Sequence, residues 1–213
     1  MSGHALLKWT RTTLAALCVA SVPVGVNAKT GHCHILVMGD SLSAAYGLPV
    51  EQGWVAFMDR RLKEKFPQCQ LTNASISGET TAGGKTRLPA LLKQHKPSLM
   101  ILELGANDGL RGLPVQTMQD NLNHMVNLAR AAGSNTVLLG MQIPANYGPA
   151  YSRRFAQAFS DVAKQQRLPF VPFFLESFAT DASAFQADSI HPNAGAQPKM
   201  LDAVWPTVSA AIR

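Results

Sequence analysis

Short apolar segments alternate with longer amphipathic segments along most of the chain. The apolar segments have the length of β-strands and an almost continuous apolar character, which is typical of parallel strands buried on both faces. They span residues 33–38, 70–75, 99–104, 136–141 and 170–173. The amphipathic segments span residues 54–66, 86–94, 115–132 and 149–166, and a last one runs from Met200 to Ile212. This alternation predicts a single three-layer α/β/α domain around a five-stranded parallel sheet of strand order 2-1-3-4-5.

Small and polar residues follow each predicted strand. In a parallel sheet the loops after the strands meet at one edge, where such folds place their working residues. The loops read, in chain order, Gly39-Asp40-Ser41-Leu42-Ser43, Ser77-Gly78-Glu79, Gly105-Ala106-Asn107-Asp108, Pro144-Ala145-Asn146-Tyr147 and Asp188-Ser189-Ile190-His191-Pro192-Asn193.

Three of these residues fit nucleophilic acyl transfer. A serine hydroxyl becomes a good nucleophile when a base removes its proton, and the base works better when a third group fixes its tautomer. Ser41 lies where a strand is expected to turn into a helix, His191 can be the base, and Asp188 is close enough in sequence to orient it.

The same loops offer donors for an oxyanion hole. Attack on an acyl carbon creates an oxyanion, and preorganised N–H groups must already point at it. The backbone N–H groups of Ser41 and Gly78 and the side-chain amide of Asn107 can supply three donors.

These residues resemble the four signature blocks of the SGNH, or GDSL, hydrolases, in order and with suitable spacing. Longer segments around them, such as residues 73–80, 87–92 and 144–148, resemble the multifunctional periplasmic esterases, thioesterases and lysophospholipases of Gram-negative bacteria. The resemblance implies a flavodoxin-like fold, a Ser41–His191–Asp188 triad, an oxyanion hole completed by Gly78 and Asn107, and no cofactor or metal. An ordinary α/β-hydrolase is disfavoured, because the chain lacks a Gly-x-Ser-x-Gly elbow.

Apolar residues near the catalytic loops suggest an acyl-chain pocket. The candidate substrate-binding residues are Leu42, Leu110, Leu113, Pro144, Tyr147 and Ile190. We expect residues 108–114, with Gly109 and Gly112 as hinges, to form a flap over the acyl chain.

Two other functions remain open at this point. An SGNH carbohydrate or peptidoglycan O-acetylesterase would need a polar pocket, whereas these loops carry leucine, isoleucine and tyrosine. A non-catalytic binding module of the same fold would not need Ser41, Asp188 and His191 together.

The N-terminus has the features of a secretory signal peptide. His4, Lys8 and Arg11 precede an uncharged stretch at residues 12–26, which is shorter than the roughly 20 residues of a membrane span. Small residues before position 29 predict removal of residues 1–28 and a single domain over residues 29–213. The mature protein is then expected in the periplasm, or secreted, without a permanent membrane anchor.

Composition supports a globular protein. Hydrophobic residues make up 46% and charged residues 15% of the 213-residue chain, which excludes a disordered protein. The formal net charge is +6, from 19 basic and 13 acidic residues. Removal of Lys8 and Arg11 leaves 17 minus 13, or +4. Because the chain has no basic run, we do not expect it to bind nucleic acid. We expect a monomer that acts on small acyl ester, thioester or lysophospholipid substrates.

Cys33 and Cys69 would be the cysteines of the mature chain. Both lie near the amino-terminal ends of strands that should be neighbours, so we predict a disulfide between them, the alternative being two buried free thiols. We interpret His32 and His34 as strand residues rather than metal ligands, because Cys33 between them faces the opposite side of the strand and no further ligand pair lies nearby in the sequence. Glu103, inside an apolar strand, is interpreted as a buried carboxylate held by backbone, serine or threonine donors, the alternative being a second acid.

Overall fold

The computed structural model describes residues 1–3 and 33–212, and residues 4–32, which hold most of the predicted signal peptide, lie outside the described residues. Five parallel strands form one sheet in the order β2-β1-β3-β4-β5, which confirms the predicted fold class. They are β1 (Cys33–Gly39), β2 (Cys69–Asn73), β3 (Leu99–Glu103), β4 (Asn135–Leu139) and β5 (Phe170–Val171). The ladders β2 to β5 end one or two residues before their apolar segments do. After β3 and β4 the chain leaves the sheet while still buried, at residues 104 and 140–141.

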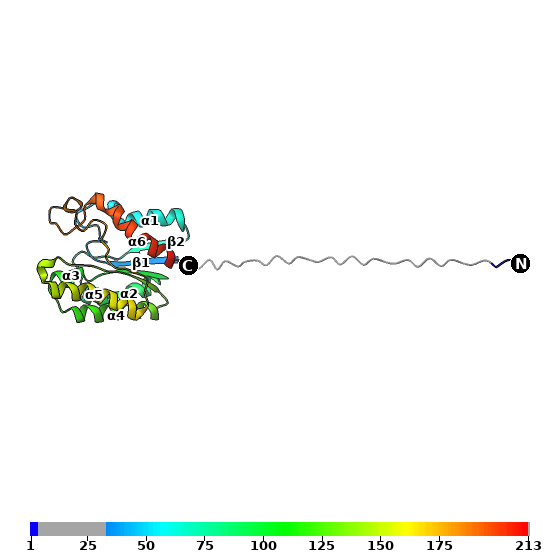
Figure 1. Ribbon diagram of the computed structural model, residues 1–213, viewed down its shortest axis with the longest axis horizontal. Helices are drawn as coiled ribbons and strands as arrows, with labels where there is room; N and C mark the ends of the chain where they lie inside the picture. The colour runs from blue at the N-terminus through cyan, green and yellow to red at the C-terminus, as the bar shows by residue number, and fades with distance from the viewer. Residues whose placement is uncertain (4–32, 213) are drawn as a thin grey trace.

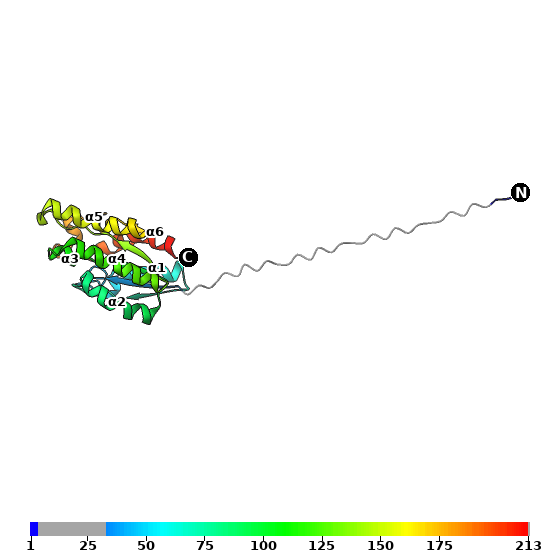
Figure 2. The ribbon, with the colours of Figure 1, turned by 90° about the horizontal axis from the view of Figure 1, so that it is seen from below.

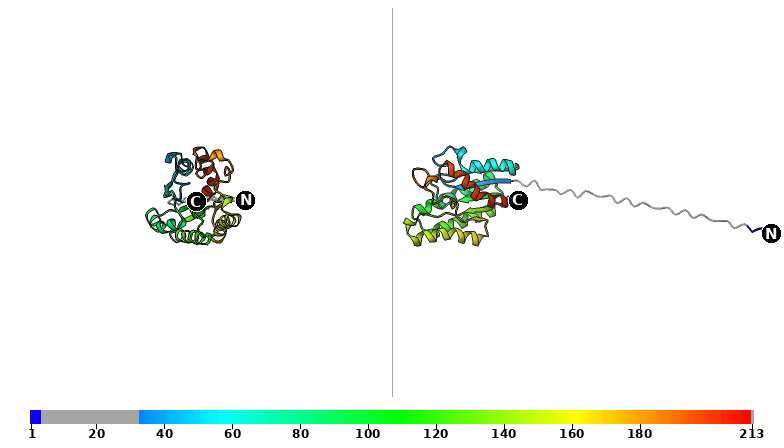
Figure 3. Two further views of the ribbon diagram at one scale, coloured as in Figure 1. Left: turned by 90° about the vertical axis from the view of Figure 1, so that its left-hand side faces the viewer. Right: turned by 45° about the horizontal axis from the view of Figure 1, so that its top comes forward.

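Helices cover both faces of the sheet (Figure 1). One face carries α1 (Trp54–Lys65) and α6 (Gln197–Ala211), and the other carries α2 (Thr81–His95), α4 (Val115–Ala131) and α5 (Pro149–Gln166). Figure 2 shows α2, α4 and α5 side by side, and Figure 3 shows the sheet between the two layers. The strand order reverses at β1, so right-handed crossovers place α1 and α2 on opposite faces.

Helix α2 begins five residues earlier than the amphipathic pattern indicates. Gly83 and Gly84 obscure the pattern in its first turn, yet Gly84 fits only without a side chain, since a Cβ there would lie 2.4 Å from Leu104. The helix start is held by Thr81, whose backbone N–H and hydroxyl donate to the Asp108 carboxylate at 2.8 and 2.6 Å. Tertiary contacts therefore determine where this helix begins.

The sheet centre is the rigid support of the loops. Residues 35–38 of β1 are fully buried, as are most residues of β3, so both sheet faces are packed. Trp54 of α1 packs edge-on against Phe174 at 5.2 Å between ring centroids, and Phe155 packs likewise against Phe159 of α5. Such aromatic pairs contribute about 0.5–1.5 kcal/mol each beyond their burial.

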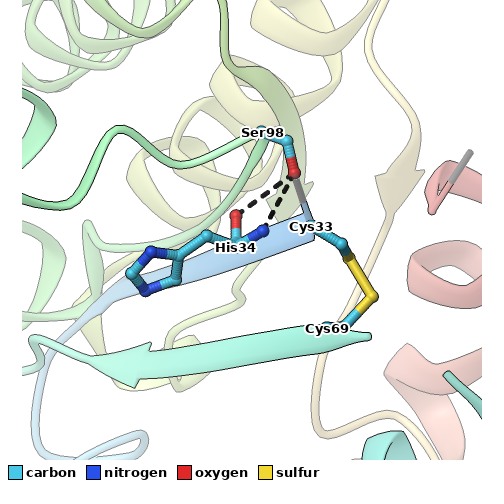
Figure 4. The surroundings of a disulfide bond; sticks show 4 residues. All are labelled: Cys33, His34, Cys69 and Ser98. Atoms are coloured by element: carbon cyan, nitrogen blue, oxygen red, sulfur yellow. Dashed lines mark hydrogen bonds between the residues drawn. A yellow bond between two sulfur atoms is a disulfide. The ribbon is translucent and has the colours of Figure 1, made fainter. Parts of the chain in front are cut away.

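Cys33 and Cys69 form a disulfide, as the sequence allowed (Figure 4). They are direct partners in the β1–β2 ladder, with Cα atoms 4.5 Å apart. Next to them, the His34 ring lies 2.8 Å from the Thr72 hydroxyl, and the His34 backbone bonds to Ser98. Within residues 33–212, no three His, Cys, Asp or Glu side chains gather to hold a metal ion, and no helix is long and apolar enough to cross a bilayer.

Candidate active site

The loops after the five strands meet at one end of the molecule. Figure 1 places α3 (Ala106–Leu110), which directly follows β3, at this end, opposite the carboxyl terminus. The disulfide lies at the other end of the strands. These loops carry four of the predicted catalytic residues, Ser41, Gly78, Asp188 and His191, and Asn107 lies in α3. Ser41 and His191 are 150 residues apart in the sequence.

Ser41, His191 and Asp188 form a continuous hydrogen-bonded row. The Ser41 Oγ atom lies 2.9 Å from Nε2 of His191, and Nδ1 of His191 lies 2.6 Å from Oδ2 of Asp188. The geometry is that of a hydroxyl next to a base whose tautomer is fixed by a carboxylate. The sequence had placed these three residues together, and the structure brings them within contact of one another.

A tight turn holds Asp188 against the histidine. Ser189 adopts a left-handed conformation with φ of 59°, which lets the backbone N–H groups of Ile190 and His191 donate to Oδ1 of Asp188 at 2.9 and 3.0 Å. These bonds, first that from the His191 backbone, then that from the His191 ring, lower the pKa of Asp188 from 3.8 to about 2. The carboxylate is therefore charged whenever the histidine is ready to accept a proton.

Ser41 lies in a run of turns rather than at the start of a regular helix. The Ala44 N–H donates to the Asp40 carbonyl at 2.9 Å and the Tyr46 N–H to the Ser41 carbonyl at 3.1 Å. Gly47, with φ of 73°, ends this segment, and the first α-helix begins only at residue 54. The turn still presents the Ser41 side chain to His191, as expected.

Each of the three candidate oxyanion donors has an N–H group that makes no hydrogen bond to a described protein acceptor. Among the described residues, neither the Ser41 nor the Gly78 backbone N–H donates to a protein acceptor. Gly78 has a φ of 80°, a conformation suited to glycine, and the space over its Cα is open except for Arg111, which donates to the Gly78 carbonyl at 3.0 Å. The Asn107 amide uses one N–H on Asp40, at 3.1 Å, and retains a second.

A pair of buried carboxyl groups lies beneath the nucleophile turn. Asp40 accepts from the Leu42 backbone at 3.0 Å and from Asn107, while Oε2 of Glu103 accepts from the Ser43 hydroxyl at 2.6 Å and from the Asp40 backbone at 3.3 Å. Burial raises the pKa of Asp40 to about 6 and that of Glu103 well above its usual value. Because N–H donors reach both oxygens of Asp40, whereas Oε1 of Glu103 has no partner in the described structure, we assign the charge to Asp40 and the proton to Glu103.

The Glu103 contacts confirm a carboxyl group held by backbone and serine donors. The sequence did not indicate that Asp40 orients Asn107. The only available signal was its position beside Ser41, which also suits a turn residue.

The candidate acyl-binding residues differ in exposure. Leu42 is 6% exposed and belongs to the core, and Leu110 is half-buried against it. Leu113, Pro144, Tyr147 and Ile190 are exposed at the catalytic edge. Tyr46, which no sequence motif indicated, packs against His191 with ring centroids 4.4 Å apart.

The segment expected to form a flap is partly anchored. Asp108 is buried against Thr81, and a Cβ at Gly109 would lie 2.5 Å from Phe155, so α3 is firmly packed. Gly112, by contrast, has open space around it and a φ of 63°. Tyr151 donates to the Leu113 carbonyl at 2.8 Å. Of the two glycines expected to act as hinges, only Gly112 therefore has free space around it.

The fold and the site together define a serine hydrolase with the SGNH arrangement, in which serine, glycine, asparagine and histidine come from four separate loops. Residues 37–197 match the GDSL-like Lipase/Acylhydrolase family. The chain belongs to this family, and it is an ester-hydrolysing serine hydrolase.

Curated relatives support the same assignment. The chain is 50% identical to Esterase TesA of Pseudomonas aeruginosa over 198 residues, which cover 93% of this chain and 98% of that protein. It is 42% identical to an arylesterase of Vibrio mimicus, over 80% of this chain and 85% of the relative. It is 40% identical to Thioesterase 1/protease 1/lysophospholipase L1 of Escherichia coli, over 79% of each chain.

Solved structures agree on the fold. The crystal structure of TesA superposes with a TM-score of 0.81 at 49% identity, covering 84% of this chain and 99% of the other. The psychrotrophic esterase EstA of Pseudoalteromonas, in a form inhibited by monoethylphosphonate, gives a TM-score of 0.79 at 43% identity, over 83% and 97% of the two chains.

Proposed function

We propose that the protein hydrolyses acyl esters and acyl thioesters, lysophospholipids among them, with Ser41 as nucleophile, His191 as general base and acid, and Asp188 as the group that orients the histidine. The observation that carries this proposal is the row from Ser41 through His191 to Asp188, with contacts of 2.9 and 2.6 Å. The arrangement needs no cofactor for its chemistry.

In the first half of the reaction, Ser41 Oγ attacks the acyl carbon and its proton passes to Nε2 of His191. The new oxyanion accepts hydrogen bonds from the N–H groups of Ser41 and Gly78 and from the Asn107 amide. The bond to the leaving oxygen or sulfur then breaks, and His191 protonates the leaving group.

In the second half, water attacks the acyl-enzyme and gives its proton to His191. The intermediate collapses, the Ser41–acyl bond breaks, and the serine recovers its proton. Asp40 keeps Asn107 in place in both halves, because its carboxylate accepts one N–H of the amide and leaves the other N–H for the oxyanion.

The substrate class follows from what surrounds the nucleophile. Exposed side chains of Leu113, Tyr147 and Ile190 offer apolar contact to an acyl chain, which favours acyl esters over acetylated sugars. The names of the relatives, an esterase, an arylesterase and a thioesterase and lysophospholipase, support the same breadth.

The proposal includes export. Residues 1–28 would be removed as a signal peptide, leaving residues 29–213 as one monomeric hydrolase domain in the periplasm. A disulfide between Cys33 and Cys69 supports an oxidising compartment. Mass spectrometry of the protein from a periplasmic fraction tests this, and a chain that still carries residues 1–28 would contradict it.

The decisive experiment is Ser41→Ala, assayed with p-nitrophenyl esters and with a fluorophosphonate label. We expect loss of hydrolysis and of labelling with an unchanged circular dichroism spectrum, and the same loss of hydrolysis for His191→Ala. Ser209→Ala, in the last turns of α6, is the control and should keep both activities. Wild-type hydrolysis by Ser41→Ala would end the proposal.

A further inference from the structure

Large exposed apolar side chains are concentrated at the catalytic edge. Apart from Met1, every one in the described chain lies in the connection between a strand and the next long helix, and none lies on the outer faces of α1, α2, α4, α5 or α6. Single exposed apolar residues normally scatter over a surface, whereas their concentration on one face marks an interaction site. The residues are Tyr46, Val50, Ile76, Leu113, Tyr147 and Ile190.

The part of this edge formed by residues 74–80, 105–117 and 142–157 also carries unbalanced positive charge. Its two carboxylates are already engaged, Glu79 with Arg87 and Asp108 with Thr81. Three arginines in these segments are exposed: Arg111, Arg153 and Arg154.

Apolar and cationic groups thus occur together on one half of the edge, which we name the docking face: Ile76, Leu113, Tyr147, Arg111, Arg153 and Arg154. Figure 2 shows that α3 and the first turns of α5 lie at the same end of the molecule. Ile76 is tied to the nucleophile loop, because its N–H donates to the Gly39 carbonyl at 3.1 Å. The other half of the edge carries exposed carboxylates, Glu51, Glu176 and Asp181 among them. The two halves of the edge therefore differ in charge.

We propose that the docking face binds the surface of an anionic phospholipid membrane, with the apolar side chains in the headgroup layer and the arginines on lipid phosphates. Arginine near an anionic surface and tyrosine at the boundary of the acyl region are both favourable. The inference goes beyond the proposed hydrolysis, since docking needs no turnover.

Sedimentation with vesicles tests the docking. All proteins carry Ser41→Ala, so that the lipids persist, and all come from a periplasmic fraction with the same N-terminus verified by mass spectrometry. The vesicles are phosphatidylcholine alone or phosphatidylcholine with one quarter phosphatidylglycerol. We expect binding to the anionic vesicles that weakens with salt.

Two variants address the face. Ile76→Asp and the pair Arg153→Gln with Arg154→Gln should each reduce the partition coefficient. At about fivefold per arginine, the pair should reduce it by about 25-fold at low salt. The matched control is Lys65→Gln with Lys93→Gln, which removes the same charge from exposed positions in the last turns of α1 and α2, at the opposite edge. The control should change the partition coefficient less than twofold.

Equal loss in the arginine pair and the lysine pair would overturn the inference, because the effect would then be one of net charge. Absence of binding to anionic vesicles would also overturn it. So would concentration-dependent dimerisation that Ile76→Asp abolishes, since a second copy would then occupy the face. With Ser41 intact, the arginine pair should hydrolyse soluble p-nitrophenyl acetate within twofold of wild type. Failure of hydrolysis in the wild type would count against the proposed function and leave the docking result standing.

Discussion

Removal of the Cys33–Cys69 disulfide should destabilise the protein without impairing its catalysis. The bond closes a loop with a sequence separation of 36 residues. In the chain-entropy account, a loop of this length gives about 3.8 kcal/mol of unfolding free energy at 25 °C. For a chain of this size that corresponds to a fall of about 8–15 °C in Tm.

The assay is urea unfolding of Cys33→Ala, Cys69→Ala and the double variant, with thermal melts alongside. Alanine is preferred to serine because Cys69 is buried and a hydroxyl there would lack a partner. Each single variant already breaks the bond, so each should lose as much stability as the double variant. The value of kcat should be unchanged, because the bond lies at the amino-terminal ends of β1 and β2, away from the loops of the site.

Two results would refute this reasoning. Single losses that sum to the double loss would assign the effect to the packing of each sulfur atom rather than to the bond. A double variant that is folded but inactive would show that the two ends of the sheet are coupled.

Three further predictions concern the site. Asp188→Asn should lower kcat by about 10³–10⁴-fold with little change in KM, because the amide no longer fixes the histidine tautomer; a loss below tenfold would contradict the triad. Glu103→Gln should gain unfolding free energy relative to wild type as pH rises above 4.5, by up to about 1.4 kcal/mol per pH unit. The sign follows because the folded chain keeps the Glu103 proton while the unfolded chain releases it. The raised pKa of Asp40 costs stability in both proteins, whereas only wild type also loses the contribution of Glu103 over this range. Parallel stability curves between pH 4 and 8 would mean that Glu103 is ionised in the fold. Leu110→Ala with Leu113→Ala should shift the preferred acyl chain to a different length in a p-nitrophenyl ester series, and an unchanged profile would exclude their contact with the chain.

The sequence by itself determined the layered architecture and most of the chemistry. Buried parallel strands must be apolar on both faces and surface helices on one, so the alternation of the two patterns is readable without a structure. Acyl transfer requires a serine, a histidine and a carboxylate, and Ser41, His191 and Asp188 lie in loops that this fold brings to one edge of the sheet. Their identities therefore predicted the row that the structure contains.

Only the tertiary structure decided how these loops are supported. The start of α2 depends on Asp108, which lies 27 residues from Thr81 in the chain, and the support of Asn107 depends on Asp40, 67 residues away. The local pattern also could not show that Leu42 is buried or that Tyr46 stacks on His191. Periodicity reports which face of an element is apolar, whereas burial, pKa shifts and hydrogen-bond partners depend on residues that the crossovers of the sheet bring together from distant parts of the chain.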